Sequence, residues 1–387
     1  MSPSPSPDLA LGLPAARYQA HRPAIEAAVA AVFAGGRFIL GPQVAAFEAE
    51  FAAALGLPHC AAVANGTDAV ELALRACGIG PGAAVLTVPF TATGTVAAIE
   101  RAGARPVWVD IDPVTFTLDP ASLEATIAAY QASGEPARQH PLRAVVPVHL
   151  YGQPADLPSI LAVAARHGLA VIEDCAQAHG AALQGRPVGT WGDAAAFSFY
   201  PTKNLGAFGD GGAVALPDPG RDRLVRQLRE YGWVERHVSV QPGANSRLDE
   251  LQAAILRVLL PHLPAENAAR TAAARVYDSR LQDTGLVLPV TRPGAVHAFH
   301  QYAVRSPARD PLQRALAGHG IPTQVLYPVP LHRQPAYAGR CFSDPNGLPH
   351  SEAAARQVLC LPMSPHLPPS DLEAVAAALH AALASIP

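Results

Sequence analysis

Seven short segments that are almost wholly apolar, separated by stretches of helical periodicity, constrain the fold of this chain more than any other feature of its sequence. They lie at residues 60–64, 84–88, 106–110, 144–148, 170–173, 194–199 and 213–216. A strand with one face in water alternates apolar and polar residues, whereas a strand covered on both faces stays apolar along its length. Covered strands that alternate with helices are typical of α/β proteins. The pattern therefore predicts a large α/β domain with a mostly parallel, seven-stranded sheet.

The segments on either side of this region predict further parts of the chain. A helical segment at 23–33 and a helix from Val44 to Leu55, stopped by Gly56, precede the sheet. Downstream we expect helices at 248–260, 265–281, 311–319, 351–358 and 370–386, strands at 298–304 and 323–326, and a long loop at 328–346. We predict a disordered Ser-Pro tail at 1–12, a large domain at 13–260 and a smaller C-terminal α+β domain at 261–387.

Charge, hydropathy and cysteine spacing exclude several classes of protein. With 28 Lys and Arg against 31 Asp and Glu, the net charge is −3, which favours neither nucleic acid nor an anionic membrane as a partner. No apolar stretch reaches the ~18 residues that a membrane span needs, and the N-terminus lacks the features of a signal peptide. The five cysteines have no metal-binding spacing, so we expect reduced thiols, no metal site and a cytoplasmic location.

A lysine stands four residues after the end of the sixth predicted strand, in the sequence AAAFSFYPTKNLGAFGDGGAVAL. Lys203 enters a glycine-rich loop whose short side chains solvate an amine poorly. Poor solvation lowers the pKa of an amine and makes it a better nucleophile. Such amines react with carbonyls, including that of pyridoxal phosphate. A surface loop lysine is the alternative.

Small and hydroxyl-bearing residues at two strand ends predict a phosphate site. In the sequence ANGTDA, Gly66 and Thr67 open a helix, and backbone N–H groups at a helix N-terminus bind phosphate. Gly66 lets the phosphate approach closely. Ser198, at the end of its strand, can donate a hydrogen bond to the same group. Ordinary N-capping by Thr67 or Asp68, and a strand serine bonded to its neighbours, are the alternatives.

An acidic pair ends the fifth predicted strand, in the sequence VIEDCAQAHG. A carboxylate at the end of a buried strand needs a cation nearby, because burial without one is costly. The protonated nitrogen of a pyridine ring is such a cation, and an acidic partner makes the ring an electron sink. Asp174 is therefore the candidate partner of a pyridoxal phosphate ring, with a cap on the following turn as the alternative.

Taken together, the motifs NGTDA, EDCAQAHGA, FSFYPTKNLGAFGDGGAV and NSRLDELQAAIL resemble those of the DegT-type nucleotide-sugar aminotransferases. The resemblance runs from about Gly41 to His262 and continues more weakly through YPVPLHRQPAY and LCLPMSP. It implies pyridoxal 5′-phosphate as the cofactor and the type I fold of aspartate aminotransferase. It also implies a homodimer whose active sites lie at the subunit interface.

The resemblance assigns a role to each matching residue. Lys203 resembles the lysine that binds the cofactor covalently, and Asp174 resembles the partner of the pyridine nitrogen. Gln177 resembles the side chain that contacts the phenolic oxygen. The phosphate ligands that the resemblance implies are Gly66, Thr67 and Ser198, together with Asn245 from the other subunit.

One segment departs from the family pattern. Many members carry an aromatic residue where the sequence VPFTATGT has Ala92, and that aromatic ring stacks on the cofactor. Phe90 is the aromatic residue nearby that could cover the ring instead. Packing of Phe90 in the core is the alternative.

Three residues are weaker candidates for the substrate side of the site. His149 follows the fourth predicted strand, with a hydrogen-bonded structural histidine as the alternative. Arg247 is a candidate substrate-side cation, with an ion pair to Glu250 or Asp249 as the alternative. His332 belongs to the segment that corresponds to the sugar-side loop of the family.

We therefore predict a ping-pong transamination from L-glutamate to a keto group of a dTDP- or UDP-linked deoxysugar. Lys203 would hold the cofactor and then move the proton as general base and acid. Dehydrating relatives on this fold carry histidine at the lysine position, so Lys203 argues against that chemistry. An aminotransferase for a cyclitol or aminobenzoate precursor, or a non-catalytic regulatory protein, are the alternatives.

Overall fold

The computed structural model describes residues 14–344 and 346–386, and its centre is an eight-stranded sheet with the strand order β1-β9-β8-β5-β4-β2-β3-β14. Seven strands are the predicted ones: β1 (His59–Val63), β2 (Ala84–Thr87), β3 (Arg105–Trp108), β4 (Leu142–Val146), β5 (Ala170–Asp174), β8 (Ala194–Ser198) and β9 (Gly212–Leu216). The eighth, β14 (Phe342–Ser343), comes from the segment predicted as a loop and pairs in parallel with β3. The α/β prediction is confirmed, and the number of strands is corrected to eight.

Most of the sheet is parallel, as predicted. Strands β3, β2, β4, β5 and β8 pair in parallel, while β9 runs antiparallel to β8 and to β1. Two reversals leave β1 running in the direction of β8. The carboxyl ends of β1, β5 and β8 therefore meet at one edge, which is where ligands bind in sheets of this kind.

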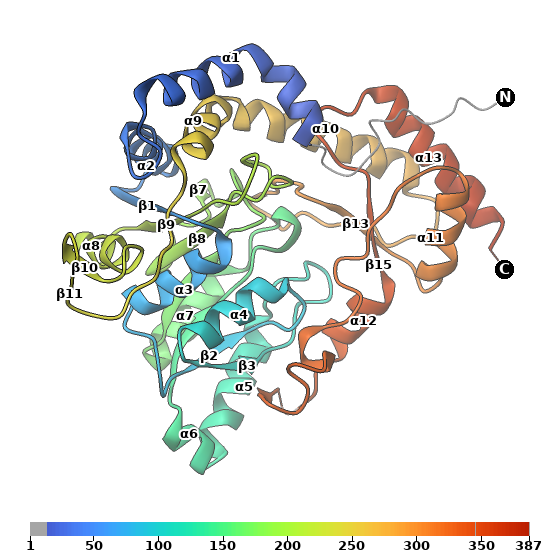
Figure 1. Ribbon diagram of the computed structural model, residues 1–387. Coiled ribbons are helices and arrows are strands. Elements are labelled where there is room, and N and C mark those ends of the chain that lie inside the picture. The colour runs from blue at the N-terminus through green and yellow to red at the C-terminus, as the bar shows by residue number, and fades with distance from the viewer. Residues whose placement is uncertain (1–13, 345, 387) are drawn as a thin grey trace.

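Helices cover both faces of the sheet, which explains why its strands are apolar throughout. Helices α3 (Gly66–Ala76), α4 (Thr93–Arg101) and α8 (Pro219–Leu228) pack on one face, and α3 and α4 are in front of the sheet in Figure 1. The other face packs against α2 (Pro42–Leu55), α5 (Pro120–Ala132), α7 (Leu157–His167) and α9 (Glu250–Leu259). None of the described helices could cross a membrane.

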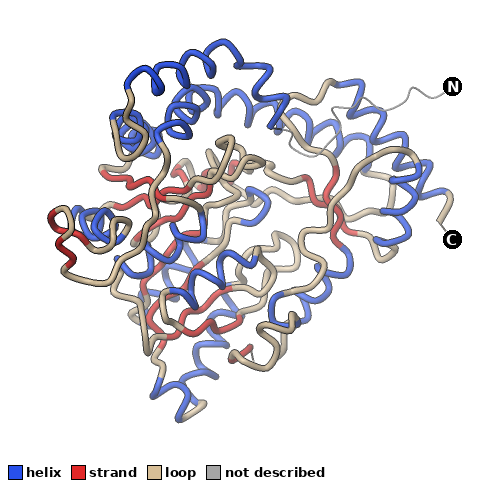
Figure 2. Tube along the Cα trace, in the orientation of Figure 1, coloured by secondary structure: helices blue, strands red, loops and turns tan. Residues whose placement is uncertain are grey.

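A smaller unit lies beside the sheet, at the right in Figures 1 and 2. Strands β13 (Tyr302–Arg305) and β15 (Val358–Leu361) pair antiparallel and share a core with helices α10 (Leu263–Leu281), α11 (Arg309–Gly318) and α13 (Pro369–Ala384). β15 follows α12 (Pro349–Gln357) without a break, and the strand predicted at 323–326 is reduced to a single bridge between Gln324 and Cys360. The predicted domain limits remain a prediction, and the tail at 1–12 lies outside the described residues.

The remaining elements are short, apart from the N-terminal helix α1 (Pro14–Gly35). They are α6 (Glu135–Gln139), η2 (Leu150–Gly152), β6 (Ala182–Leu183), β7 (Arg186–Pro187), β10 (Trp233–Glu235), β11 (Val238–Ser239), η3 (Leu260–His262), β12 (Ala295–Val296) and η4 (Leu331–Arg333).

A carboxylate from far along the chain caps helix α2. Glu250, the first residue of α9, accepts hydrogen bonds from the backbone N–H groups of Gly41, Gln43 and Val44 at 2.8, 2.9 and 2.8 Å. The first N–H groups of a helix have no partner within the helix, so an external carboxylate satisfies them and complements the helix dipole. A Cβ atom at position 41 would lie 2.7 Å from Oε2 of Glu250, which explains the glycine there.

Candidate active site

A cavity of about 480 Å³ opens at the sheet edge where β1, β5 and β8 end. Parallel strands bring their carboxyl ends to one edge, and the loops that follow them supply the walls. The residues that line the cavity are Asn65, Gly66, Thr67, Val70, Ala92, Gly94, Thr95, Arg101, Asp174, Ala176, Ser198, Tyr200, Lys203 and Asp210. Five of the predicted site residues are therefore brought together.

The start of α3 forms one end of the cavity. The Asn65 side chain caps this helix by accepting a hydrogen bond from the backbone N–H of Asp68 at 2.8 Å. A Cβ atom at Gly66 would lie 2.6 Å from Cβ of Ser198, so only glycine permits this approach of α3 to β8. The N-terminus of α3, Thr67 and Ser198 together offer donors to an anion.

Asp174 ends β5 and is buried, with 4% of its surface exposed. Its Oδ2 accepts a hydrogen bond of 2.8 Å from the Thr95 hydroxyl, and its Oδ1 accepts one of 3.1 Å from the backbone N–H of Ala176. A buried carboxylate with two such donors is suited to a cationic ligand atom, because the donors fix it without neutralising its charge.

Lys203 lies in the loop after β8 and is the only lysine in the chain. The residue is partly exposed to the two cavities, and burial of its amine lowers the pKa of Lys203 to about 8, against the opposing attraction of the Asp174 charge. A fraction of the amine is therefore unprotonated near neutral pH, which a nucleophile and general base requires.

A second cavity, of about 300 Å³, meets the first at Lys203. It is lined by Gln177, Tyr200, Thr202, Lys203, His300, Gln301, Gln324, Leu326, Tyr327 and Met363. Gln177 accepts a hydrogen bond from the backbone N–H of Tyr151 at 2.7 Å and donates one to the Tyr327 hydroxyl at 3.1 Å. Most of these groups are neutral hydrogen-bonding side chains, which can bind the hydroxyl and carbonyl groups of a substrate.

The residues of the first cavity fit pyridoxal phosphate. A glycine-led helix N-terminus suits its phosphate, the Asp174 carboxylate suits its ring nitrogen, and the Lys203 amine suits its aldehyde. A Cβ atom at Gly94 would lie 2.9 Å from Oγ1 of Thr67, so the wall opposite the helix start is also kept free of side chains.

Phe90 does not contribute to this cavity. Its side chain is fully buried in the core, with ring centroids 6.1 Å from Phe116 and 6.3 Å from Tyr327. Ala92 lines the cavity instead, at the N-cap of α4. The expectation that Phe90 covers a cofactor ring is corrected to the alternative, core packing, because its ring is enclosed by other aromatic side chains.

His149 has the geometry of a structural histidine. It is fully buried, its Nδ1 accepts a hydrogen bond from the backbone N–H of Ala155 at 3.0 Å, and its Nε2 lies 3.2 Å from Oε2 of Glu173. Glu173 also accepts three backbone N–H groups of the loop at residues 189–192. His149, Glu173 and Cys175 lie close enough to hold a metal ion, but the histidine and carboxylate donors are already engaged. The substrate role considered for His149 is therefore replaced by its structural alternative.

The remaining three predicted site residues do not line either cavity of their own chain; they are Asn245, Arg247 and His332. Nε2 of His332 is 3.1 Å from Oε1 of Glu352 on α12, and its substrate role stays a prediction. Arg247 has no ion pair with any described residue, and Glu250 caps α2 instead. Asn245 is exposed on the segment before α9, where a second copy of the chain could reach it.

Two further polar residues of the site, Thr95 and Arg101, were not predicted from the sequence. Thr95 contacts Asp174 from the first turn of α4, and the four-residue spacing from Thr91 places the two hydroxyls 3.2 Å apart. Arg101 lines the cavity near the start of α3, where it pairs with Asp68 and Glu71 at 2.8 and 2.9 Å. The hydroxyl spacing could have singled out Thr95, but nothing local to Arg101 distinguishes it from a surface arginine.

A lysine between two cavities, with a buried carboxylate and a helix N-terminus at one edge of a mostly parallel sheet, defines a pyridoxal phosphate-dependent transferase. The chain belongs to the DegT/DnrJ/EryC1/StrS aminotransferase family, whose model matches residues 19–380. It is a pyridoxal phosphate-dependent transaminase, and the predicted fold, cofactor and enzyme class are confirmed.

Two relatives and one solved structure are similar to this chain over most of their length. The chain is 46% identical over 354 residues to a dTDP-3-amino-3,4,6-trideoxy-alpha-D-glucose transaminase of Streptomyces venezuelae, covering 91% of this chain and 90% of that protein. It is 44% identical to a UDP-N-acetyl-3-dehydro-alpha-D-glucosamine 3-aminotransferase of Acidithiobacillus ferrooxidans, covering 89% and 90%. A crystal structure of NtdA from Bacillus subtilis, with the cofactor PMP bound, superimposes with a TM-score of 0.87 at 28% identity, covering 100% of this chain and 86% of that one.

Proposed function

We propose that this protein transfers an amino group from L-glutamate to a keto group on the sugar ring of a dTDP- or UDP-linked deoxysugar, by a ping-pong mechanism. The observation that carries the proposal is the position of Lys203 on the boundary between two cavities. One cavity has the donors and the carboxylate that a pyridoxal phosphate molecule needs. The other has the neutral hydrogen-bonding groups that suit a sugar.

Each residue has a defined part in this chemistry. Bound pyridoxal phosphate supplies the electron sink that stabilises negative charge at the carbon bearing the amino group. Asp174 keeps the ring nitrogen protonated, and Thr95 holds that carboxylate in place. The Lys203 amine, with its pKa near 8, would accept the proton from the substrate carbon and deliver it to the exocyclic carbon of the cofactor.

We further propose a homodimer in which each site is completed by the partner. Asn245 is exposed, although the resemblance places its counterpart at the phosphate. Tyr231, Val234, Val238 and Val240, on and around the β10–β11 hairpin, are also exposed large apolar side chains. Exposed apolar side chains gathered on one element are typical of a protein interface. A second copy of the chain packed there would bring Asn245 to its neighbour's cavity.

The test is a panel of dTDP- and UDP-linked keto sugars, each supplied with L-glutamate labelled with ¹⁵N. We expect an amino sugar carrying the label, detected by mass spectrometry, and no product with the Lys203→Ala variant. Transfer only to a cyclitol or aminobenzoate precursor would contradict the substrate assignment. When unlabelled amino acids compete with the labelled glutamate, an amino sugar that carries mostly unlabelled nitrogen would contradict glutamate as the donor.

The same protein sample tests the alternative of a non-catalytic regulator. We expect a visible absorbance band from the bound cofactor that borohydride bleaches, leaving the cofactor mass on the peptide that contains Lys203. Because the chain has one lysine, the label has only one side-chain amine to occupy. A colourless protein that takes up no pyridoxal phosphate would support the regulator.

A further inference from the structure

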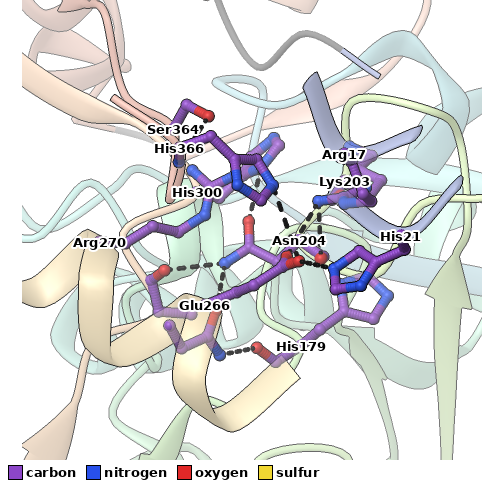
Figure 3. Close-up of polar contacts among 12 residues, drawn as sticks. Arg17, His21, His179, Lys203, Asn204, Glu266, Arg270, His300, Ser364 and His366 are labelled. Carbon is purple, nitrogen blue, oxygen red and sulfur yellow. Dashed lines mark hydrogen bonds and ion pairs between the residues drawn. The ribbon is translucent and has the colours of Figure 1, made fainter. Parts of the chain in front are cut away.

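A buried arginine of the N-terminal helix holds the backbone of the lysine loop. Arg17 of α1 has 5% of its surface exposed. Its Nη2 donates hydrogen bonds to the carbonyl oxygens of Lys203 at 3.1 Å and Asn204 at 3.0 Å. Figure 3 shows Arg17 beside Lys203 and Asn204, with both contacts drawn. Donation from a charged group makes these bonds stronger than those between neutral groups.

The ion-pair partner of this arginine is Glu266. Glu266 of α10 lies 3.5 Å from Nη2 of Arg17. The same carboxylate lies 3.5 Å from Nε2 of His21 and 3.8 Å from Nε2 of His366. Burial lowers the pKa of the Arg17 guanidinium, and the Glu266 charge acts in the opposite direction. Burying a charged side chain costs free energy unless the charge is paired and hydrogen-bonded. The burial of Arg17 therefore depends on its contacts with Glu266 and with the two carbonyl groups.

Hydrogen bonds of the Asn204 side chain hold the other side of the same loop. Its Nδ2 donates hydrogen bonds to Oδ1 of Asn267 at 2.9 Å and to the carbonyl oxygen of Ala298 at 2.8 Å. Its Oδ1 lies 3.1 Å from Nδ1 of His300. The loop is therefore held from α1 through Arg17 and from the C-terminal part of the chain through Asn204.

We propose that Arg17 is a positioning residue for Lys203, fixing the lysine backbone so that the amine stays between the two cavities. Two carbonyl groups bonded to one guanidinium cannot turn independently, so the loop keeps a single conformation. The side chain of Lys203 then begins from a fixed point, which matters because misplacement of a reacting group by about 1 Å can reduce a rate by about 100-fold. The proposal rests on the catalytic role of Lys203 stated above.

The competing explanation is that Arg17 only attaches α1 to the rest of the protein. Three variants and a control separate the two. Arg17→Met removes the donor, and Arg17→Lys keeps the charge. The double variant, Arg17→Met with Glu266→Gln, removes both charges. It is included because losing both partners of a buried pair destabilises a protein less than losing one. Arg309→Met is the matched control, since Arg309 is a buried arginine that donates to two carbonyl groups, those of Ala355 and Val358, away from the lysine loop.

The experiment measures the pH dependence of amine acylation on the full-length protein without cofactor, using acetic anhydride and mass spectrometry of the Lys203 peptide. Neither cofactor nor substrate is needed, so a wrong substrate assignment would not affect the result. In the wild type we expect the labelling rate to rise with a midpoint near pH 8. Arg17→Met and the double variant should move the midpoint upward by about one pH unit, because a released loop exposes the amine to water.

The Arg309→Met control, the double variant and Arg17→Lys distinguish a positioning role of Arg17 from simple attachment of α1. Arg309→Met should lower the melting temperature and leave the labelling midpoint unchanged. The double variant should recover much of the melting temperature lost in Arg17→Met without recovering the midpoint, and Arg17→Lys should recover part of the midpoint. In the holoenzyme we expect about a tenfold fall in kcat with KM changed less than about twofold. A wild-type midpoint in both Arg17→Met and the double variant would overturn the proposal and leave Arg17 a structural attachment.

Discussion

The hydroxyl of Thr95 donates a 2.8 Å hydrogen bond to Oδ2 of Asp174, the carboxylate assigned to the cofactor ring. Thr95 lies in the first turn of α4 and Asp174 at the end of β5, so the contact joins a helix to the sheet edge. A carboxylate that accepts such a bond is held in one orientation. Thr95 is thus a supporting residue whose removal should weaken, but not abolish, the action of Asp174.

Replacing Thr95 by valine tests this relationship, because valine keeps the shape and lacks the hydroxyl. A hydrogen bond to a charged group contributes about 1.5–3 kcal/mol, so we expect kcat/KM to fall about tenfold or more. Thr95→Ser, which keeps the donor, should stay within about threefold of the wild type. Equal losses in the two variants would contradict the role of the hydroxyl.

Asp174→Asn should fold and bind cofactor but lose roughly 100-fold or more of its activity. A neutral amide cannot keep the ring nitrogen protonated, and the electron sink depends on that proton. The absorbance spectrum of the bound cofactor and kcat should be measured together. Wild-type turnover would mean that Asp174 only caps the following turn.

Glu173→Gln should reduce stability even though Glu173 lies outside both cavities. The buried carboxylate accepts hydrogen bonds from the backbone N–H groups of Gly189, Trp191 and Gly192 at 2.7–2.8 Å and also contacts His149. An amide would direct its own N–H group at one of these donors, so we expect a loss of about 3 kcal/mol in the free energy of unfolding. Denaturant titration measures it. Glu124→Gln, at a partly exposed carboxylate that pairs with Arg166 and His167, is the control and should cost less than about 1 kcal/mol.

The lowered pKa of Lys203 predicts a pH dependence of stability in the protein without cofactor. The native state releases the lysine proton near pH 8, whereas the unfolded chain keeps it up to the ordinary value of 10.5. Between these values the unfolded state binds more protons, so stability should rise with pH from about 8 to 10.5. Lys203→Met has no amine to titrate, and its stability should lack that rise. Parallel curves for the two proteins would show that the amine is not desolvated.

Mixing two inactive variants tests the shared site. If Asn245 reaches the partner's phosphate, a heterodimer of Lys203→Ala and Asn245→Asp has one site with both changes and one with neither. Random exchange gives half heterodimers with one good site each, so recovery should approach about a quarter of wild-type activity. The new carboxylate of Asn245→Asp repels the phosphate, which should make that variant inactive alone.

Lys203→Ala mixed with Asp174→Asn is the control for this experiment. Both residues line one cavity of a single chain, so no combination of these subunits gives an intact site. We expect no recovery from the control mixture. Recovery there, or none with Asn245→Asp after exchange is verified by mass, would contradict the shared site.

The sequence predicted the sheet and the centre of the site because both follow from local patterns. Apolar segments locate covered strands, and parallel strands place their carboxyl ends at one edge. Lys203, Asp174 and Gly66 could therefore be expected together before any contact was known. Phe90 could not be resolved, because a buried aromatic residue two positions from Ala92 has the same local pattern whether it faces a cofactor or the core.

These local patterns could not predict contacts between segments that lie far apart in the sequence. Arg17 is 186 residues from Lys203 in sequence, and a lone arginine in a helix carries no sign of the carbonyl groups it will bind. β14 was missed because a two-residue strand has too few residues to show a period. The contact of His332 with Glu352, 20 residues further along the chain, could not be predicted from local patterns either.

The capping of α2 by Glu250 also sets an order of events during synthesis of the chain. The cap is 209 residues downstream of Gly41, and a ribosome adding about 5–20 residues per second needs roughly 10–40 s to reach it. Phe47 and Phe51 of α2 pack on Phe197 and Phe199, which are also made late. For that interval the segment that forms α2 lacks both its cap and the partners of its aromatic side chains. A holding chaperone that binds exposed aromatic side chains would have a binding site there.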